Sequence, residues 1–229
     1  MNIDEIAAMI DHTLLKPEAT GAEVKKLCQE AREYRFASVC VNPCYVGLAV
    51  DCLSGSAVKT CTVSGFPLGA TFPEVKAAEA ERALTLGAEE IDMVINIGAL
   101  KAGEHAIVRH DILAVAEVCR PAGALLKVII EAAYLTEEEK ETACRIVVES
   151  AADFVKTSTG FAPSGARKED VQLMRRVVGE RMGVKAAGGI RDFATLREMV
   201  QAGANRIGTS SGVKICLEAK AWMERGPER

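Results

Sequence analysis

The sequence lacks the features that mark membrane proteins and nucleic-acid-binding proteins. No apolar run approaches the ~20 residues that a membrane-spanning helix requires, and the first residues, MNIDEIAAMIDHTLL, carry early acidic groups in place of the basic start of a signal peptide. The net charge is −4, from 28 basic and 32 acidic residues, and aromatic residues make up only 4% of the chain. We therefore expect no basic or base-stacking surface, no nucleic-acid partner and no membrane association.

The eight cysteines follow no recognised metal-binding pattern. No CxxC motif occurs, and the three histidines (His12, His105 and His110) stand at no ligand spacing that is typical of metal sites. Most cysteines lie in apolar stretches, as Cys40 does within Ala37–Val41. We interpret them as small buried hydrophobic residues. The sequence thus predicts no metal and no cofactor, and a reducing, cytoplasmic location.

Strand-like and helix-like segments alternate along the whole chain, which is typical of an α/β fold with a parallel sheet. The length of 229 residues is close to the ~250 residues of a (β/α)₈ barrel. We predict a single (β/α)₈ barrel domain over residues 1–229, with a short disordered tail after about residue 223; an open doubly wound sheet is the alternative. The eight strand candidates are Met9–Leu14, Ala37–Val41, Val58–Val63, Ile91–Ile95, Leu125–Ile130, Phe154–Lys156, Val184–Ala186 and Arg206–Ile207.

Several helix ends are also readable. Pro73 stands at a first-turn position of one helix, which Gly87 ends. Residues 136–139, Thr-Glu-Glu-Glu, form a predicted capping box that begins another helix. Asp192 is expected to cap a helix that ends near Gly203.

Charged residues stand inside four of the apolar strands: Asp92, Lys127, Lys156 and Lys185. In a barrel, reactive groups lie at the carboxyl ends of the strands. Alternation places Asp92 on one face of its strand, and either face could be the barrel interior. A buried lysine is unfavourable unless it is paired or neutral. Desolvation and a neighbouring cation favour a neutral amine, which is a nucleophile toward carbonyls. The pattern indicates Schiff-base chemistry; the alternative is that each lysine lies at the surface of a frayed strand end.

Glycine-rich segments follow the last two strands, at Ala186–Arg191 and Gly208–Gly212. In such barrels these loops commonly bind phosphate. Backbone N–H groups and small hydroxyls suit a phosphate dianion without Lys or Arg, and Thr159 with Gly160 could extend the site. Ordinary turn glycines are the alternative. The loop Ser64–Gly69 is equally consistent with a lid and with a long connection.

Four segments together resemble one known family: Asp11–Lys16, Glu90–Asn96, Phe154–Phe161 and Val184–Arg191. They are similar to deoxyribose-phosphate aldolases, in the same order and over nearly the whole chain. The resemblance implies a class I aldolase on a (β/α)₈ barrel. It further implies reversible cleavage of 2-deoxy-D-ribose 5-phosphate to D-glyceraldehyde 3-phosphate and acetaldehyde through a lysine Schiff base, in deoxyribonucleotide catabolism and without a cofactor.

The resemblance also implies roles for individual residues. Lys156 matches the Schiff-base lysine, Lys185 the second lysine whose charge favours a neutral nucleophile, and Asp92 the aspartate of the proton relay. Cys40 matches a cysteine that in some members reacts with aldehydes, and it is left out of the catalytic set. The predicted substrate-binding residues are Asp11, Lys127, Thr159, Gly160, Gly188, Gly189, Gly208, Ser210 and Ser211.

Other functions fit parts of the pattern. Another phosphate-binding barrel could be a different Schiff-base lyase, or a general-base isomerase, which needs no essential amine. A non-catalytic phosphate-sugar-binding domain would bind without turnover, although binding alone does not require buried amines. For any of these functions the expected partner is a small phosphorylated sugar, and we expect a homo-oligomer, either a dimer or a tetramer.

Overall fold

The computed structural model describes residues 1–225, which form eight parallel strands closed into a barrel in the order β1 to β8. All eight strand candidates are present, and their ends differ from the prediction by no more than two residues. The closed sheet confirms the barrel and excludes the open doubly wound alternative. The strands are β1 (Ile10–Leu14), β2 (Ser38–Val41), β3 (Lys59–Ser64), β4 (Glu90–Val94), β5 (Leu125–Ile129), β6 (Phe154–Lys156), β7 (Gly183–Ala187) and β8 (Arg206–Thr209).

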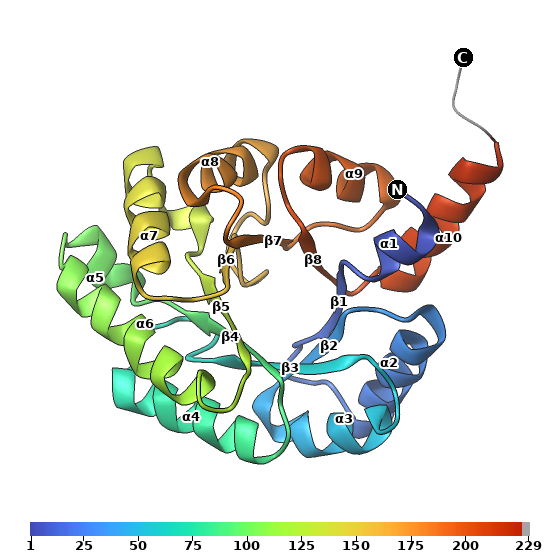
Figure 1. The fold of residues 1–229 in the computed structure, drawn as a ribbon, viewed down its shortest axis with the longest axis horizontal. Helices are drawn as coiled ribbons and strands as arrows, with labels where there is room; N and C mark the ends of the chain where they lie inside the picture. Colours follow the sequence, from blue (N-terminus) through green and yellow to red (C-terminus); the bar gives the residue numbers. More distant parts are fainter. Residues whose placement is uncertain (226–229) are drawn as a thin grey trace.

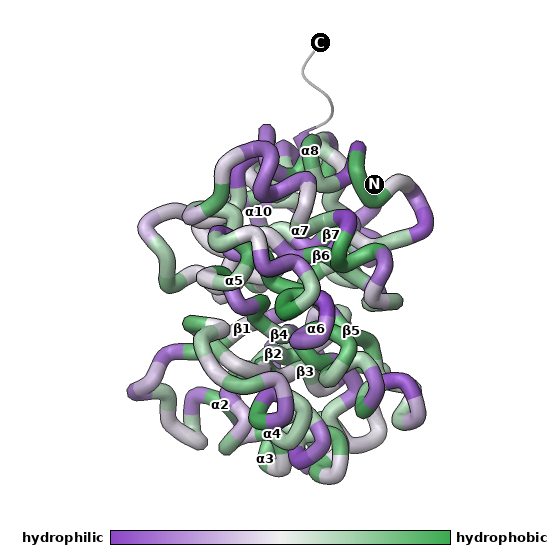
Figure 2. The backbone as a smooth tube through the Cα atoms, turned by 90° about the vertical axis from the view of Figure 1, so that its left-hand side faces the viewer, coloured by the Kyte–Doolittle hydropathy of each residue, from purple (hydrophilic) through white to green (hydrophobic). Residues whose placement is uncertain are grey.

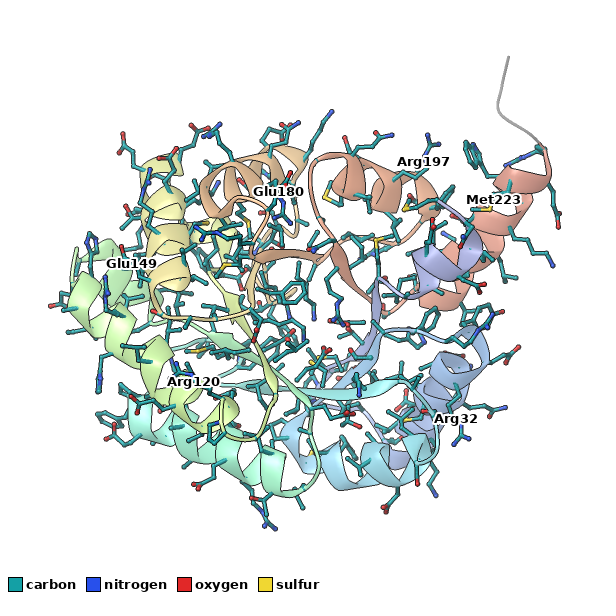
Figure 3. The ribbon with its side chains drawn as sticks, in the orientation of Figure 1. Arg32, Arg120, Glu149, Glu180, Arg197 and Met223 are labelled. Atoms are coloured by element: carbon teal, nitrogen blue, oxygen red, sulfur yellow. The ribbon has the colours of Figure 1, made fainter. Side chains whose placement is uncertain are left out.

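Helices surround the barrel as an outer ring (Figure 1). The charged side chains of Arg32 and Glu149 lie on the outer side of this ring (Figure 3), and both residues are exposed. The helices are α1 (Ile3–Ala7), α2 (Gly21–Tyr34), α3 (Val46–Leu53), α4 (Pro73–Thr85), α5 (Ile97–Lys101), α6 (His105–Cys119), α7 (Glu137–Glu149), α8 (Lys168–Val178), α9 (Phe193–Gln201) and α10 (Gly212–Glu224), with 3₁₀-helices η1 (Pro43–Tyr45) and η2 (Ala132–Tyr134).

The predicted helix starts agree with the structure. Pro73 is the first residue of α4. The Thr136 side chain accepts a hydrogen bond from the backbone N–H of Glu139, whose side chain accepts one in return from the Thr136 backbone N–H. The Asp192 side chain accepts from the backbone N–H of Thr195 at the start of α9. These local signals were readable because each cap satisfies a backbone donor that the helix itself cannot.

The main apolar core lies between the outer faces of the strands and the helices. Figure 2 shows hydrophobic segments along the central strands and hydrophilic segments along outer helices and loops. On β4, Ile91 and Met93 belong to this outer core, whereas Asp92 contacts side chains of β5, β6 and β7 inside the barrel. The face of β4 that carries Asp92 is therefore the interior face.

No helix within residues 1–225 is long and apolar enough to cross a bilayer. Helix α10 continues to Glu224, so the prediction of a disordered tail after about residue 223 is wrong at Glu224. The helix persists there because Trp222 and Met223 pack against the core. The remainder of the predicted tail, residues 226–229, lies outside the described residues.

Candidate active site

Asp92 joins three lysines from three neighbouring strands. The Asp92 carboxylate accepts hydrogen bonds from the Nζ of Lys127 at 2.8 Å, of Lys156 at 2.7 Å and of Lys185 at 2.6 Å. Lys127 pairs in register with Asp92, and Lys156 pairs with Lys185. Because paired residues of parallel strands point to the same face, the four side chains meet inside the barrel. The structure thus brings together the three predicted catalytic residues and Lys127.

Three further charged side chains complete this arrangement. Asp11 lies 2.5 Å from Lys185 and 3.8 Å from Lys127. Glu90 lies 2.6 Å from Lys127, and Arg206 contacts Asp11 at 2.7 Å and Glu90 at 3.2 Å. Sequence reasoning missed Glu90 and Arg206, although each is a charged residue at the first position of a barrel strand. We call the full set the ion cluster: Asp11, Glu90, Asp92, Lys127, Lys156, Lys185 and Arg206.

The lysines of the ion cluster differ in how many carboxylates they contact. Within the described chain, Lys127 contacts three carboxylates, Lys185 contacts two, and Lys156 contacts only Asp92, which it shares with both other lysines. The cluster holds four cationic groups and three carboxylates. The cationic groups thus outnumber the carboxylates by one, and Lys156 is the lysine with the fewest carboxylate contacts.

Charge interactions overcome burial at Asp92, Lys127 and Lys185. Burial opposes ionisation of Asp92, but the three lysines outweigh it and hold the pKa of Asp92 well below its ordinary value. Burial likewise opposes charging of Lys185, but Asp11 and Asp92 prevail and raise the pKa of Lys185. The pKa of Lys127 is raised in the same way, chiefly by Asp92 against its own burial. Asp92 is thus an anion at neutral pH, beside two fixed ammonium groups.

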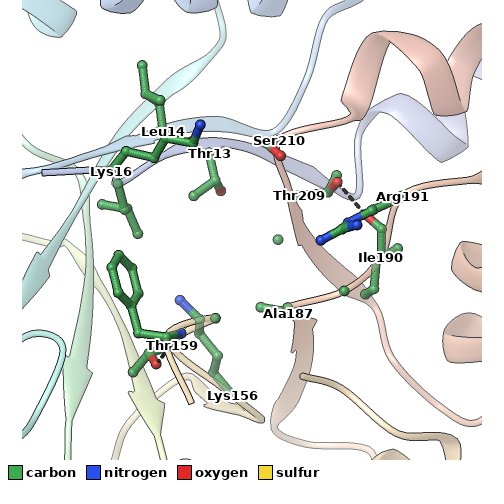
Figure 4. Close-up of a pocket in the computed structure, with 16 residues that line it drawn as sticks. Thr13, Leu14, Lys16, Lys156, Thr159, Ala187, Ile190, Arg191, Thr209 and Ser210 are labelled. Atoms are coloured by element: carbon green, nitrogen blue, oxygen red, sulfur yellow. Dashed lines mark hydrogen bonds between the residues drawn. The ribbon is translucent and has the colours of Figure 1, made fainter. Parts of the chain in front are cut away.

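A cavity of about 350 Å³ opens at the carboxyl ends of the strands. Lys156 lines this cavity and its amine extends into it (Figure 4). Asp92 and Lys185 do not line it, because they lie deeper in the barrel and are fully buried. The geometry therefore presents one amine of the ion cluster to a ligand and keeps the other charged groups behind it.

The predicted substrate-binding residues divide between two places. Six of them line the cavity: Thr159, Gly160, Gly188, Gly189, Gly208 and Ser210. Asp11 and Lys127 do not, because they belong to the buried ion cluster. Ser211 also lies outside the lining, and its backbone N–H donates to Thr209 Oγ1 at 2.9 Å where α10 begins. Asp11, Lys127 and Ser211 thus lie outside the cavity lining, and their contact with a substrate stays a prediction.

Two cationic side chains also line the cavity, those of Lys16 and Arg191. Sequence reasoning did not assign either of them to it. They project from different sides of the cavity in Figure 4. The Lys16 side chain is 72% exposed, as expected for a group at the rim. The loops that were expected to bind phosphate without Lys or Arg therefore have two cationic side chains beside them. Both residues stand in the segments quoted above, and the available signal was a positive charge within four residues of a strand end.

The loops after β6 and β7 touch backbone to backbone. A Cβ atom at Gly165 would lie 2.1 Å from the carbonyl oxygen of Gly188, and one at Gly188 would lie 2.9 Å from the Cα of Gly165. Gly188 also has φ +86°, which disfavours side chains. Only glycine allows the two loops to meet beside the cavity.

Comparisons with known proteins agree with this geometry. Residues 6–218 match the family model described as DeoC/LacD family aldolase. The chain belongs to this family. It is 61% identical to a deoxyribose-phosphate aldolase of Clostridium tetani (strain Massachusetts / E88), over 94% of this chain and 100% of that protein. It is 60% identical to a deoxyribose-phosphate aldolase of Thermococcus kodakarensis, over 94% of this chain and 97% of that protein.

A solved structure shows the same fold. The tetrameric deoxyribose phosphate aldolase from Aeropyrum pernix has a TM-score of 0.90 and 34% identity, over 96% of this chain and 93% of that one. The predicted family and the aldolase activity are therefore confirmed. The isomerase and the non-catalytic binding domain are set aside.

The loop Ser64–Gly69 of this aldolase reaches the cavity wall. The Phe66 ring packs edge-on against the ring of Phe161, with centroids 5.4 Å apart, and Phe161 lines the cavity. The backbone N–H of Gly65 donates to Glu79 on α4 at 2.8 Å. The loop is thus anchored at its base and contacts the rim, which fits either a lid or a connection.

His12 takes no part in the cavity lining of the aldolase. Its Nε2 lies 2.8 Å from Glu30 on α2, so the ring faces the helix layer. Burial lowers the pKa of His12. This environment supports a structural role for His12.

Cys40, Cys61 and Asp92 are the one group of potential metal-ligating side chains found in residues 1–225. Their ligand atoms lie within 4.8 Å of one another. Lys127 Nζ already lies 3.4 Å from Cys61 Sγ and 2.8 Å from Asp92. An ammonium group thus already contacts two of the three donors, and the donor set fits a resident metal ion poorly.

Proposed function

We propose that this aldolase reversibly cleaves 2-deoxy-D-ribose 5-phosphate to D-glyceraldehyde 3-phosphate and acetaldehyde through an imine on Lys156, in deoxyribonucleotide catabolism. The observation that carries the proposal is the position of Lys156. It is the amine of the ion cluster that lines the cavity, and it has the fewest carboxylate partners. The substrate is supported by the relatives named deoxyribose-phosphate aldolase at 61% and 60% identity.

The reaction begins with the neutral Lys156 amine. Its nitrogen attacks the C1 aldehyde, and the resulting carbinolamine loses water to give a protonated imine. The C2–C3 bond then breaks, because the two-carbon product is acetaldehyde. Its electron pair moves into an enamine, and the C3 hydroxyl loses its proton to become the aldehyde of glyceraldehyde 3-phosphate. Protonation of the enamine carbon and hydrolysis of the imine release acetaldehyde. The iminium is the electron sink, so the proposal requires no cofactor.

Asp92 and Lys185 support these steps from behind Lys156. The Asp92 carboxylate lies 2.7 Å from the Lys156 nitrogen, so it is placed to move protons at that nitrogen or at the carbinolamine oxygen, directly or through one water. The Lys185 ammonium shares the same Asp92 oxygen, at 2.6 Å. A second positive charge at Lys156 is thereby disfavoured in the resting enzyme.

The remaining predicted residues hold the substrate or the ion cluster. Asp11 and Lys127 keep Asp92 and Lys185 charged and in place. Lys16 and Arg191 supply positive charge at the cavity for the phosphate, and its binding energy orients the reacting carbons. The loops that we propose form the phosphate cradle contribute Thr159, Gly160, Gly188, Gly189, Gly208 and Ser210.

Borohydride trapping tests the function. Adding 2-deoxyribose 5-phosphate with sodium borohydride is expected to reduce the imine and leave a stable adduct that peptide mass spectrometry locates at Lys156. Lys156→Ala is expected to lose the adduct and reduce turnover at least ~10⁴-fold while remaining folded, because the nucleophile is gone. The matched control Lys16→Ala also removes a cavity amine and keeps the adduct. An adduct at another lysine, or none in active protein, contradicts the proposal.

We also propose a homo-oligomer, either a dimer or a tetramer, in the cytoplasm. The Aeropyrum pernix aldolase is described as tetrameric. Large apolar side chains are exposed on this chain, among them Leu68, Phe72, Ile107 and Leu217, which fits covered surfaces in an assembly. The eight cysteines are free thiols, which fits a reducing compartment. Light scattering at several protein concentrations measures the assembly.

A further inference from the structure

Glu131 has an unusual backbone and an unusual burial for its residue type. It lies two residues after the end of β5 and is the residue before η2. Its side chain is among the buried polar groups, with the residue 2% exposed, and its backbone is left-handed, with φ 49° and ψ 64°. That conformation is unfavourable for a residue with a Cβ atom. Such residues persist where the surrounding structure requires them, often beside a functional site.

The backbone on both sides of Glu131 is bonded to the segment that carries Lys156. The N–H of Ile130 donates to the carbonyl oxygen of Lys156 at 3.0 Å, and the N–H of Ala132 donates to that of Thr157 at 2.9 Å. These two bonds continue the β5–β6 pairing past the strand ends. Glu131 stands between them, and its side chain extends to the next turn of the same segment.

The Glu131 carboxylate accepts two hydrogen bonds from Thr159. The Thr159 backbone N–H lies 3.2 Å from Glu131 Oε2, and the Thr159 hydroxyl donates to the same oxygen. The Thr159 Oγ1 in turn accepts from the N–H of Phe161 at 3.0 Å. One carboxylate thereby orders the three residues of the turn Thr159–Phe161, all of which line the cavity.

This turn lies against the glycine loop after β7. A Cβ atom at Gly188 would lie 3.5 Å from the Cα of Gly160, and Gly160 itself has φ +89°. Displacing the turn would therefore open the cavity wall where two of the proposed phosphate loops meet. The Lys156 amine is held by Asp92 and its backbone by strand pairing, and neither contact involves the Glu131 carboxylate.

The Glu131 carboxylate makes no ion pair among the described residues, and its contacts are with uncharged donors. Burial raises the pKa of Glu131, against the bonds from Thr159 and the charge of Lys156. Burying a carboxylate without a salt bridge is unfavourable. The buried carboxylate and the left-handed backbone are both unfavourable. Packing alone does not explain why a glutamate stands at this position.

We propose that Glu131 is a positioning residue for the phosphate end of the substrate: it holds the turn Thr159–Phe161 against the Gly188 loop, so that the cradle is formed before the substrate binds. The inference rests on the proposed function, because it assigns the phosphate to these loops.

The test is Glu131→Gly, which keeps a residue suited to positive φ and removes the carboxylate. We expect the KM for 2-deoxyribose 5-phosphate to rise roughly tenfold or more, as for the loss of charge-assisted hydrogen bonds. We expect kcat/KM for 2-deoxyribose without phosphate to change less than about twofold. Glu131→Gln keeps an acceptor oxygen for Thr159, so its KM should rise less than that of Glu131→Gly.

The matched control is Ala151→Gly, which makes the same type of change at another left-handed residue, with φ 54°, between α7 and β6. This variant should leave KM and kcat/KM unchanged for both 2-deoxyribose 5-phosphate and 2-deoxyribose. An equal loss of kcat/KM on both substrates with Glu131→Gly overturns the proposal, because Glu131 would then support Lys156 or the fold as a whole. Unchanged kinetics with both substrates also overturns it.

Inorganic phosphate separates this inference from the proposed function. The wild-type protein and Lys156→Ala should both gain thermal stability on adding inorganic phosphate, whereas Glu131→Gly should gain much less. If the wild type fails to cleave the sugar but shows this difference, the proposed reaction is wrong and the role of Glu131 stands. If Glu131→Gly responds to phosphate as the wild type does, the role of Glu131 is wrong.

Discussion

At the scale of single residues, the same side chain acquires different roles from its neighbours. Lys127, Lys156 and Lys185 all contact Asp92, and the sequence marked all three because a charge inside an apolar strand needs a reason. The residue pattern alone did not distinguish the nucleophile from its neighbours; the family resemblance did. The structure adds the physical distinction, which is the number of carboxylates around each amine and the opening of one amine to the cavity.

Replacing Lys185 tests this distinction. Lys185→Met removes the ammonium that shares an Asp92 oxygen with Lys156, so Lys156 should take up a proton more readily. We expect kcat/KM to fall about 10²-fold near neutral pH and the acid limb of the pH–rate profile to move to higher pH. The measurement is kcat/KM across pH, with circular dichroism to verify folding.

Lys140→Met is the control for Lys185→Met. Lys140 forms an ion pair with Asp170 between α7 and α8, away from the cavity. This variant should keep the pH–rate profile of the wild type. A Lys185→Met profile that is also unshifted would remove Lys185 from the mechanism.

At the scale of elements, one buried ion pair fixes the end of the strand that carries Asp92. Lys76 on α4 and Asp111 on α6 lie 2.6 Å apart and are almost completely buried. Lys76 Nζ donates to the carbonyl oxygen of Val94 at 2.8 Å, and Asp111 accepts from the N–H of Asn96 at 3.0 Å. The pair therefore satisfies backbone groups where β4 ends, which no local sequence signal predicts.

Breaking this pair should destabilise the fold strongly. Lys76→Met leaves Asp111 buried without its partner, and we expect the free energy of unfolding to fall by about 3–5 kcal/mol. The double variant Lys76→Met with Asp111→Leu removes both charges. Its free energy of unfolding should fall less than that of Lys76→Met alone. Denaturant unfolding measures both variants. Equal or greater loss in the double variant would show that packing, and not an unpaired charge, is responsible.

At the scale of the whole molecule, the interior of the barrel holds an ion network beside a small apolar cluster of Leu15, Cys40, Cys61 and Val63. Arg206, Glu90 and Asp11 connect the first and last strands to β4. Lys185, Lys127 and Arg206 outweigh the burial of Asp11, and its pKa is lowered from the ordinary value of 3.8. Closure of the barrel and ionisation of its interior are thus coupled.

That coupling predicts how stability depends on pH. Because the folded-state pKa of Asp11 is depressed, its stabilising contribution is present above pH 3.8 and is lost as the pH falls toward the folded-state value. Asp11→Asn should be less stable at pH 7, and its melting temperature should fall less steeply between about pH 4 and pH 2 than that of the wild type. Parallel melting curves for the two proteins over that range would contradict this role for Asp11.

The sequence by itself determined the local features of this protein. Strand positions, the capping box at Thr136 and the N-cap at Asp192 were predictable because each depends on neighbouring residues and on backbone groups within one turn. The segments around Asp92, Lys156 and Lys185 were also predictable, since a charge in an apolar strand is a strong departure from the pattern. Through the family resemblance, they indicated an aldolase as well.

Only the tertiary structure decided which of these residues meet and which face the cavity. Alternation alone could not show which face of strand β4 is the barrel interior. The closed sheet places the face that carries Asp92 inside. Asp11 and Lys127 lie in the ion cluster and not in the cavity lining, while Lys16 and Arg191 do line it. The Glu131–Thr159 contact joins residues 28 apart in sequence. Such contacts depend on the closure and register of the sheet, which are set by packing over the whole chain and leave no mark on neighbouring residues.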